Sequence, residues 1–441
     1  MKRASERFFV IVLLLISMHV VSGLLSSSEV NTETSNAIVS TEVHLPTVIS
    51  ELVMYLWCGL LIIPRWKITL RAVLDAWPIL LLPALSIVSS VWSIDPALTL
   101  RRSSFFTLST VMAIYLGERY SMEEFAGLFA QAQCWLICGS VAMFFVVPAK
   151  VLDPSHIGAW KGLTVHKNVF GECMAVAVLL FLLVRFKRHP ILRALFLGVS
   201  VLLLYLAHSV TPTIACGVVI LAIPVLRRVP RLRIKERVFA YTLVVGLTIL
   251  SVVLMTNYSA DILPLLGKDS TLSGRAQLWS LVMDEIWKRP ILGYGYEAFW
   301  QGFKGDSRGI LEATGWLVPM AHNGYLDLWL SLGLIGIVAY LFVFLRSMRM
   351  ALNYLRYDRR TIAVWPVAYL CFFSLHNTAE STLLTRTTFE FLIFVVVAVS
   401  LQQHEIRQRS AEYEGEIEDA PASVPSFGLS APTFGSSGVS I

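Results

Sequence analysis

Long apolar stretches recur along this 441-residue chain and constrain its fold more than any other feature. A helix needs about 20 consecutive apolar residues to cross a bilayer, whereas the strands of a membrane β-barrel show alternating segments of about ten residues. The sequence has the first pattern and lacks the second. It is 56% hydrophobic and only 15% charged, against roughly 25% charged residues in soluble domains. The sequence therefore predicts an all-α, polytopic helical bundle in a membrane.

Twelve stretches approach the length and apolarity that a spanning helix needs. Lys and Arg in the intervening loops set the orientation, because basic residues gather in cytoplasmic loops. With the N-terminus inside, the inner segments hold two thirds of the 36 Lys and Arg residues. This predicts that both termini are cytoplasmic, and it attributes the net charge of +6 to topology rather than to a nucleic-acid partner. The predicted spans are residues 7–24, 47–63, 76–92, 103–118, 125–148, 169–185, 191–208, 210–226, 238–256, 324–345, 362–377 and 384–401.

The first span has two interpretations, and the loops divide the chain into six parts. One interpretation of the first span is a cleaved signal peptide, because "VSG" precedes "SSS" after a basic start and an apolar core. We prefer an uncleaved anchor, and cleavage would leave the orientation unchanged. The parts are a first span or signal anchor at 1–24, a polar periplasmic lead-in at 25–46, spans 2–9 at 47–256, a large periplasmic loop at 257–322, spans 10–12 at 323–401 and a tail at 402–441, whose Ser-, Gly-, Pro- and Glu-rich composition is typical of disorder.

The large loop contains one short stretch with the pattern of an amphipathic helix, "LSGRAQLWSLVMDEIWKRP". Ser273 can act as its N-cap, and Pro290 ends it. Leu278 and Val282 lie four residues apart and belong to one apolar face. We expect this helix to lie on the outer leaflet of the membrane. Arg275 then falls in its first turn, beside free backbone N–H groups.

Several outer Lys and Arg residues are exceptions to the positive-inside pattern. Arg101 and Arg102 lie in "WSIDPALTLRRS", and Lys167 lies in "GLTVHKNVFGE". For each of these residues alone, anchoring to lipid headgroups explains its position at least as well as a functional role does. Together with Arg275 at a helix N-terminus, they suit an anion, and a diphosphate is the lipid-linked anion that we expect.

His322 is the last loop residue before a span, in "AHNGYLDLWLSLGLIG". An interfacial histidine on its own is more often structural. The setting favours a catalytic role, because Gly324 permits close backbone approach and Asn323 and Asp327 are near enough to help orient the ring. A general base needs a pKa near ambient pH, which histidine ordinarily has. We therefore predict that His322 is catalytic and that Asn323 contributes to substrate binding.

Other polar groups lie at the outer ends of spans. Glu380, in "HNTAESTLLTR", either caps a helix or takes part in function. His166 and Asn168 flank Lys167 in a donor-rich stretch before a span, and we predict that they bind substrate. Glu172 follows one turn later on the same helix face. It would have to face a cavity if it is charged.

The sequence predicts neither a metal site nor a cofactor. A glycosyltransferase that uses Mg²⁺ or Mn²⁺ would carry a D-x-D-type carboxylate pair in an outer loop. The adjacent Asp284 and Glu285 are interpreted instead as a solvated part of the amphipathic helix. All six cysteines fall inside apolar spans, without the spacing of a zinc site or a disulfide framework.

Five motifs occur in a fixed order along the chain. They are "WSIDPALTLRRS", "GLTVHKNVFGE", "LSGRAQLW…KRPILGYGYEAFW", "AHNGYLDLWLSLGLIG" and "HNTAESTLL". They resemble the O-antigen ligase and polymerase family of bacterial membrane glycosyltransferases, and within it the exopolysaccharide polymerases of the succinoglycan type. Each motif is weak on its own, but five in order with the correct sidedness make a strong signal. The resemblance covers about residues 85–400.

The resemblance implies an inverting, metal-independent transfer at the periplasmic face of the inner membrane. An acceptor hydroxyl attacks the anomeric carbon of a glycan carried on undecaprenyl diphosphate, and the lipid diphosphate leaves. By motif, Arg275 is the diphosphate clamp, His322 activates the acceptor, and Lys167 is a second cation. The family also implies a chain-length regulator and export proteins as partners. The stretch "AHSVTPTIACG" departs from a Ser-x-Ser-x-Thr pattern that is common in related chains, and we assign it no role.

Three functions fit these features. The first is a polymerase of lipid-linked repeat units, favoured by the "HKN" and "NTAES" signatures. The second is a ligase that moves a finished glycan onto another acceptor with the same chemistry. The third is a twelve-span transporter. Transporters of that size usually show repeated halves, whereas here the large loop follows the ninth span and the unusual polar residues gather at the outer face.

Overall fold

The computed structural model describes residues 3–25, 45–184, 189–228, 273–315, 318–358, 360–385 and 388–418. Throughout these residues the chain is helical, apart from loops and an isolated bridge between Leu152 and Trp160. The prediction of an all-α chain is therefore confirmed for the described part. The span expected at 238–256 and the outer residues 257–272 lie outside it.

The helices follow one another with short connections. They are α1 (Arg3–Ser17), α2 (Val20–Leu25), α3 (Leu45–Ile62), α4 (Trp66–Asp75), α5 (Trp77–Val88), α6 (Pro96–Arg119), α7 (Met122–Val146), α8 (Pro148–Val151), α9 (Lys167–Leu183), α10 (Pro190–Leu206), α11 (Val210–Arg228), α14 (Ser273–Lys288), α15 (Arg308–Thr314), α16 (Gly324–Tyr357), α17 (Trp365–His376) and α18 (Phe389–Glu418), with 3-10 turns at Ile63–Arg65, Ser89–Val91 and Thr361–Val364.

Each predicted span that falls within the described residues overlaps one of these helices. By length and composition, five helical stretches of the described part can cross a membrane. They are Ile49–Asp75, Met122–Val146, Val210–Arg228, Gly324–Tyr357 and Phe389–Ser410. Trp77–Val91, Pro190–Leu206 and Thr361–His376 are apolar but shorter. The number of twelve spans therefore stays a prediction, while the class of helical membrane protein is supported.

Two predicted segments differ from the structure in detail. The first span is broken, because His19 has a φ of 59° and separates α1 from α2. A left-handed residue of this kind cannot continue a right-handed helix. The tail expected to be disordered from residue 402 begins as helix, because α18 continues to Glu418. The polar residues from Gln402 onward thus continue the helix, and residues 419–441 lie outside the described part.

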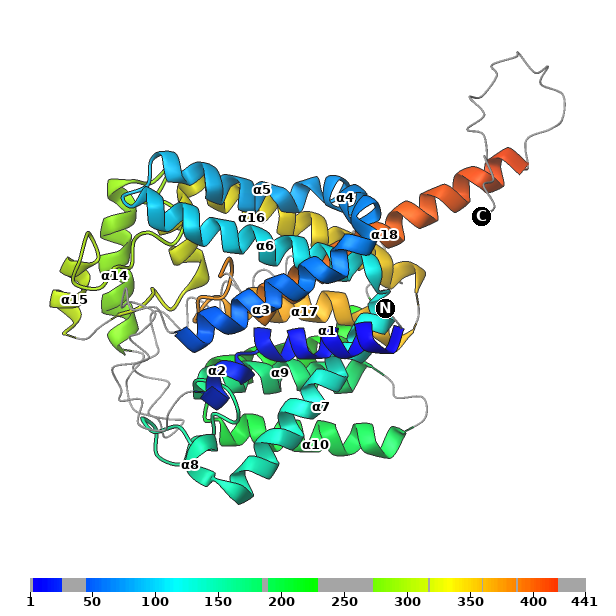
Figure 1. Cartoon of the computed structure of the whole chain (residues 1–441), viewed down its shortest axis with the longest axis horizontal. Coiled ribbons are helices and arrows are strands. Elements are labelled where there is room, and N and C mark those ends of the chain that lie inside the picture. Colours follow the sequence, from blue (N-terminus) through cyan, green and yellow to red (C-terminus); the bar gives the residue numbers. More distant parts are fainter. Residues whose placement is uncertain are drawn as a thin grey trace, which may run out of the picture.

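The core of the bundle lies around α9, α17 and the first half of α18. Helix α9 packs against α10, α11 and α17, and α18 packs against α6 and α16. From Phe170 onward almost every residue of α9 is buried, as expected for a helix that is apolar on all sides. Figure 1 shows α14 and α15 at one end of the bundle, with α4 and the far half of α18 toward the opposite end.

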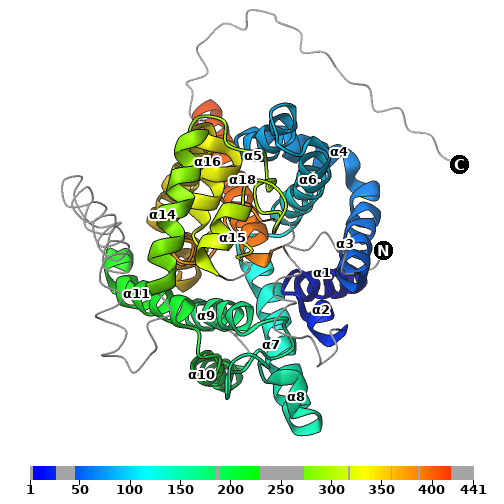
Figure 2. The ribbon, with the colours of Figure 1, turned by 90° about the vertical axis from the view of Figure 1, so that its left-hand side faces the viewer.

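Helix α14 confirms the predicted amphipathic helix but corrects what covers it. Its apolar face, with Leu278, Val282 and Ile286 fully buried, belongs to a second apolar core together with Tyr294 and Phe299. The helix packs against α16, and Figure 2 shows it running alongside α16 at that end of the molecule. The periodicity identified the buried face, but protein rather than the lipid leaflet covers it.

A strap of irregular backbone, residues 290–297, docks onto α16 where that helix is broken. Gly333 has a φ of 66° and a ψ of −165° and interrupts the helix. The backbone groups freed by the break bond to the strap: Tyr294 N donates to Leu330 O at 2.8 Å, and Leu334 N donates to Pro290 O at 2.9 Å. Non-helical backbone among apolar helices is stable only when such groups are satisfied. The strap therefore fixes the N-terminal part of α16, which begins at Gly324.

Candidate active site

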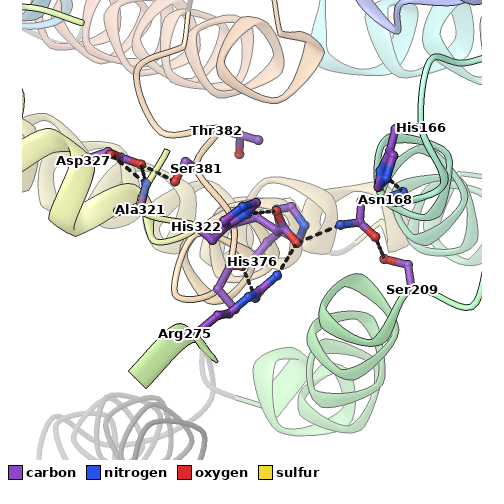
Figure 3. Close-up of polar contacts among 12 residues, drawn as sticks. His166, Asn168, Ser209, Arg275, Ala321, His322, Asp327, His376, Ser381 and Thr382 are labelled. Carbon is purple, nitrogen blue, oxygen red and sulfur yellow. Dashed lines mark hydrogen bonds and ion pairs between the residues drawn. The ribbon is translucent and has the colours of Figure 1, made fainter. Parts of the chain in front are cut away.

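Glu380 is the residue on which the candidate site converges, and its partners Asn168, Arg275 and His322 are labelled in Figure 3. It lies in the loop between α17 and α18 and is only 7% exposed. Asn168 Nδ2 donates to its Oε1 at 3.2 Å. Arg275 Nη2 lies 3.4 Å from the same oxygen, and His322 Nδ1 lies 3.6 Å from Oε2. Three predicted site residues from three separate segments thus meet at the carboxylate of a fourth.

Arg275 lies in the first turn of α14 and reaches the loop between α17 and α18. Its Nη1 donates to Ala379 O at 2.7 Å, in addition to the ion pair with Glu380. A guanidinium carries more N–H donors than these two contacts use. The arrangement fixes the position of the cation and leaves it able to bind an anion as well.

His322 has an unusual backbone conformation. Its φ is 49°, in the left-handed region that residues other than glycine rarely adopt. Such conformations persist only where the surroundings hold them, and they are enriched at functional sites. The imidazole is 20% exposed, and its separation from Glu380 is long for a hydrogen bond but within ion-pair range. The ring therefore has one nitrogen against a carboxylate and an edge open to solvent.

The charges around Glu380 determine its protonation. Burial alone would raise the pKa of this carboxyl, but the contact with His322 and the positive charge of Arg275 outweigh burial and hold the pKa at about 2. Glu380 is therefore ionised at any physiological pH. An ionised carboxylate beside an imidazole favours a proton on the facing nitrogen, Nδ1, which leaves the Nε2 lone pair available.

Asn168 links Glu380 to the helices on the opposite side. Its Oδ1 accepts from Ser209 Oγ at 3.1 Å, while its amide nitrogen donates to Glu380. His166 is the N-cap of α9, because its Nδ1 accepts from Asn168 N at 3.2 Å. His166 therefore acts on the backbone of Asn168, and Asn168 alone of the two touches the carboxylate.

Three predicted cations have other surroundings. Lys167 is the first residue of α9, and its backbone N donates to Asp153 Oδ2 at 3.2 Å. Arg102 contacts Glu297, with its Nη1 donating to the backbone oxygen and its Nε 3.8 Å from Oε2. Arg101 is exposed on α6. The structure thus brings Arg275 to the carboxylate, while the predicted roles of the other three stay untested.

Asn323 and Asp327 both form hydrogen bonds with the backbone next to His322. Asn323 is the N-cap of α16 and accepts from Tyr325 N at 3.1 Å and Leu326 N at 3.3 Å. Asp327 accepts from Ala321 N and from Trp300 Nε1. Both residues shape the backbone on either side of His322.

One group of potential metal ligands lies in the loop between α8 and α9. Asp153, His156 and His166 place ligand atoms within 4.8 Å of one another. Their hydrogen bonds explain the grouping: His156 Nδ1 is 3.1 Å from Asp153 Oδ1, and His166 Nδ1 accepts the N–H of Asn168. Burial lowers the pKa of His166, and because Nδ1 accepts a hydrogen bond, the neutral ring carries its proton on Nε2. In this tautomer Nε2 has no lone pair for a metal.

Two contacts went unnoticed in the sequence. Ser209 belongs to "AHSVTPTIACG", which received no role, and its hydroxyl holds the amide of Asn168. His376 is fully buried, with Nε2 3.0 Å from Glu172 Oε1. Glu172 was expected to face a cavity, but it pairs with this histidine instead. The carboxylate of Glu172 inside a span indicated that a polar partner was needed, but no local sequence pattern identified that partner as His376.

Residues 194–341 match the family model described as O-antigen ligase. The resemblance to the O-antigen ligase and polymerase family is confirmed. The matched part is about a third of the chain and includes Ser209, Arg275 and His322. The exopolysaccharide production protein ExoQ of Rhizobium meliloti (strain 1021) is 37% identical to this chain over 82 residues. That alignment spans 18% of this chain and 18% of ExoQ, and it agrees with the expected exopolysaccharide branch.

The O-antigen ligase region contains one half of the site and the rest of the chain contains the other. Arg275 and His322 lie inside residues 194–341, whereas Asn168 and Glu380 lie on either side of them. The carboxylate that joins the four residues therefore comes from outside the matched region. The sequence proposed Glu380 as a functional residue, and the fold shows which residues it contacts.

Proposed function

We propose that this chain is a membrane glycosyltransferase that polymerises exopolysaccharide from repeat units carried on undecaprenyl diphosphate. The observation that carries the proposal is the convergence of Arg275 and His322 on Glu380. It brings a cation suited to a diphosphate leaving group and an imidazole suited to proton transfer to the same carboxylate. The O-antigen ligase match and the likeness to an exopolysaccharide production protein support the same chemistry.

His322 is the general base in this proposal. With its proton on Nδ1 facing Glu380, the imidazole accepts the proton of an acceptor hydroxyl at Nε2. The hydroxyl oxygen forms a bond to the anomeric carbon of the donor from the face opposite the diphosphate, so the configuration inverts. Glu380 stabilises the imidazolium that forms, as the carboxylate does in a His–carboxylate pair.

Arg275 stabilises the leaving group. The bond from the anomeric carbon to the diphosphate oxygen breaks, and the electron pair stays on the diphosphate. A guanidinium can hold phosphate oxygens with two parallel hydrogen bonds, which a lysine cannot. Because Ala379 O and Glu380 already hold Arg275, its cation needs little rearrangement to meet the developing charge. Lys167, Arg101 and Arg102 are proposed as further contacts to the anionic donor.

We place the reaction at the periplasmic face of the bacterial inner membrane, with both termini in the cytoplasm. Basic α4 and the far part of α18 lie toward one end of the bundle, and α14 and α15 lie at the other (Figure 1). The positive-inside rule then assigns the site to the outer side. The lipid tail stays in the bilayer and the diphosphate lies at headgroup depth, so the scissile bond meets His322 at that level.

A ligase is the second candidate, because the matching family model carries that description. Polymerase and ligase differ only in the acceptor. Deletion of the gene followed by analysis of lipid-linked glycans separates them: accumulation of single repeat units supports the polymerase, and accumulation of full-length polymer supports the ligase. Unchanged glycans with a transport defect would support the transporter.

The test of the catalytic proposal uses the purified chain in lipid nanodiscs with a lipid-linked donor. We expect His322→Ala to lower kcat by at least about 100-fold, the lower end of what a positioned general base contributes, while donor binding is kept. His322→Gln should be nearly as inactive, because glutamine takes no proton at neutral pH. His189→Ala, at the exposed N-cap of α10, is the matched control and should keep full activity. If the glutamine variant keeps most activity, the base lies elsewhere.

A further inference from the structure

Asp327 connects the two segments that carry His322 and Glu380. It lies in the first turn of α16. Its two oxygens accept the N–H of Ala321, at 3.1 Å and 3.0 Å, and Oδ2 also accepts from Ser381 Oγ. Ala321 directly precedes His322 and Ser381 directly follows Glu380. One carboxylate thus holds the immediate neighbours of both residues (Figure 3).

Three further hydrogen bonds complete this connection around Asp327, Ala321 and Ser381, which we call the brace. Trp300 Nε1 donates to Asp327 Oδ1 at 2.7 Å and ties in the loop after the strap. On the other side of His322, Gly324 N donates to both Asn377 O and Glu380 O at 2.9 Å. A Cβ at Gly324 would lie 2.4 Å from Asn377 Oδ1, so the two segments are in close contact. The left-handed backbone of His322 is therefore fixed from both sides.

We propose that Asp327 is a positioning residue that sets the register between His322 and Glu380. Its hydrogen bonds go to the backbone N–H of Ala321 and to the side chain of Ser381, the neighbours of His322 and Glu380. The proposal rests on the proposed function of His322 as the base. It goes further by assigning the conformation of that base to a carboxylate that belongs to neither the diphosphate clamp nor the His–carboxylate pair.

The donors around Asp327 explain why a carboxylate is needed. Ala321 N, Trp300 Nε1 and Ser381 Oγ all point to it. An ionised carboxylate accepts from every one of them, whereas an asparagine has one accepting oxygen and an amide that itself donates. Asp327→Asn keeps the size of the side chain. Its amide NH₂ group, however, must lie against at least one of these N–H donors, where no hydrogen bond can form. The segment before His322 then loses part of its restraint.

The test compares Asp327→Asn with Asp284→Asn, which removes an exposed carboxylate from α14. We expect Asp327→Asn to lower kcat by about 10-fold or more with the KM for donor nearly unchanged. It should also change how kcat depends on pH at acidic pH. Asp284→Asn should behave as wild type in each measurement. Ser381→Ala, which removes a single contact of the brace, should shift kcat in the same direction by a smaller factor, and it serves if Asp327→Asn does not fold.

A second readout does not depend on activity. Modification of His322 by diethyl pyrocarbonate, followed by mass spectrometry, reports the exposure and protonation of its imidazole. We expect a changed modification rate in Asp327→Asn and Ser381→Ala but not in Asp284→Asn. If His322→Ala stays active, the base assignment fails, while this rate still tests the brace. Wild-type kcat, pH profile and His322 modification in folded Asp327→Asn would overturn the proposal.

Discussion

At the scale of single residues, Glu380 decides what the neighbouring side chains can do. It is ionised, buried and shared between a guanidinium, an imidazole and an amide. Because burial penalises a charge that lacks partners, the carboxylate keeps Arg275 and His322 close in the resting protein. In the proposed reaction the same charge orients the base and holds the cation beside the leaving group.

The first prediction concerns Arg275. Arg275→Ala should abolish polymer formation while the protein stays in the membrane, because the diphosphate loses its clamp and Glu380 loses a partner. Arg275→Lys should restore little activity, because a point charge cannot make the two parallel contacts of a guanidinium. Polymer is measured in cells and on purified donor.

Arg308→Ala is the matched control for this prediction. Arg308 lies at the same end of the bundle, on α15, and forms an exposed pair with Glu312, which contributes little to stability. It should leave polymer formation unchanged. Full activity in Arg275→Ala would remove Arg275 from the site.

The second prediction concerns pH. The folded protein holds the pKa of Glu380 at about 2, below the ordinary value of 4.5. Between these values the unfolded chain binds the proton first, so stability rises with pH in this window. The advantage of wild type over Glu380→Gln in thermal midpoint should be constant from about pH 5.5 to pH 8. It should shrink as the pH falls from about 4.5 toward 2. An advantage that grows on acidification would contradict this assignment.

At the scale of elements, the strap and the break in α16 form one unit. Gly333 permits the break, and residues 290–297 supply the hydrogen bonds that the helix loses there. Trp329 Nε1 donates to Pro290 O at 2.9 Å and Trp92 Nε1 donates to Leu292 O at 2.9 Å, so both sides of the strap are tied down. The start of α16, with Asn323 and Asp327, depends on this unit for its direction.

The third prediction tests that unit. A Cβ at Gly333 would lie 2.1 Å from Ile291 O, and its φ of 66° disfavours any side chain. Gly333→Ala should therefore destabilise the protein by about 2 kcal/mol or more, within the range of strain and clash effects, and it should lower activity. Gly198→Ala is the control, because a Cβ there meets no atom within 4 Å on an exposed face of α10. It should be neutral or stabilising by up to about 1 kcal/mol. Thermal unfolding in detergent compares the two, and equal midpoints would rule out the strap as a support.

At the scale of the whole molecule, the residues of the candidate site gather at one end of the bundle. Helices α9, α14, α16 and the loop after α17 contribute to the site there, while the apolar core lies below it. The proposed chemistry suits that geometry, because a lipid-linked donor has its tail in the bilayer and its reactive bond at the surface. His376 and Glu172 form a buried polar contact in the bundle, and His376 lies four residues before Glu380 in the chain.

The fourth prediction concerns metal ions. The proposed transfer uses Arg275 to stabilise the diphosphate, and the hydrogen bonds of Asp153, His156 and His166 satisfy the group with metal-ligand spacing. Activity of the purified chain on a lipid-linked donor should therefore survive EDTA. The rate is measured before and after chelation and after re-addition of Mg²⁺ or Mn²⁺. Loss on chelation and recovery with either ion would show that a metal takes part.

The sequence by itself determined what depends on short-range pattern. Apolar runs of spanning length predicted the helices, and spacing of three and four residues identified the buried face of α14. The ordered motifs assigned Arg275 and His322 to the same reaction, because the residues of each motif are close together in the chain and can be recognised locally. The same local reasoning missed the break at His19 and the continuation of α18, where a single backbone angle or a polar helix outside the bundle leaves no apolar signal.

Only the tertiary structure decided which of the candidate residues meet. Asn168 and Glu380 are 212 residues apart in the chain, and Arg275 and Glu380 are 105 apart, so no local period relates them. Their contacts depend on how α9, α14 and α17 pack, which is set by the fit of whole helix faces. For the same reason Ser209 gained a partner while Arg102 paired with Glu297. Helix packing brings distant side chains within the few ångströms over which hydrogen bonds and ion pairs act.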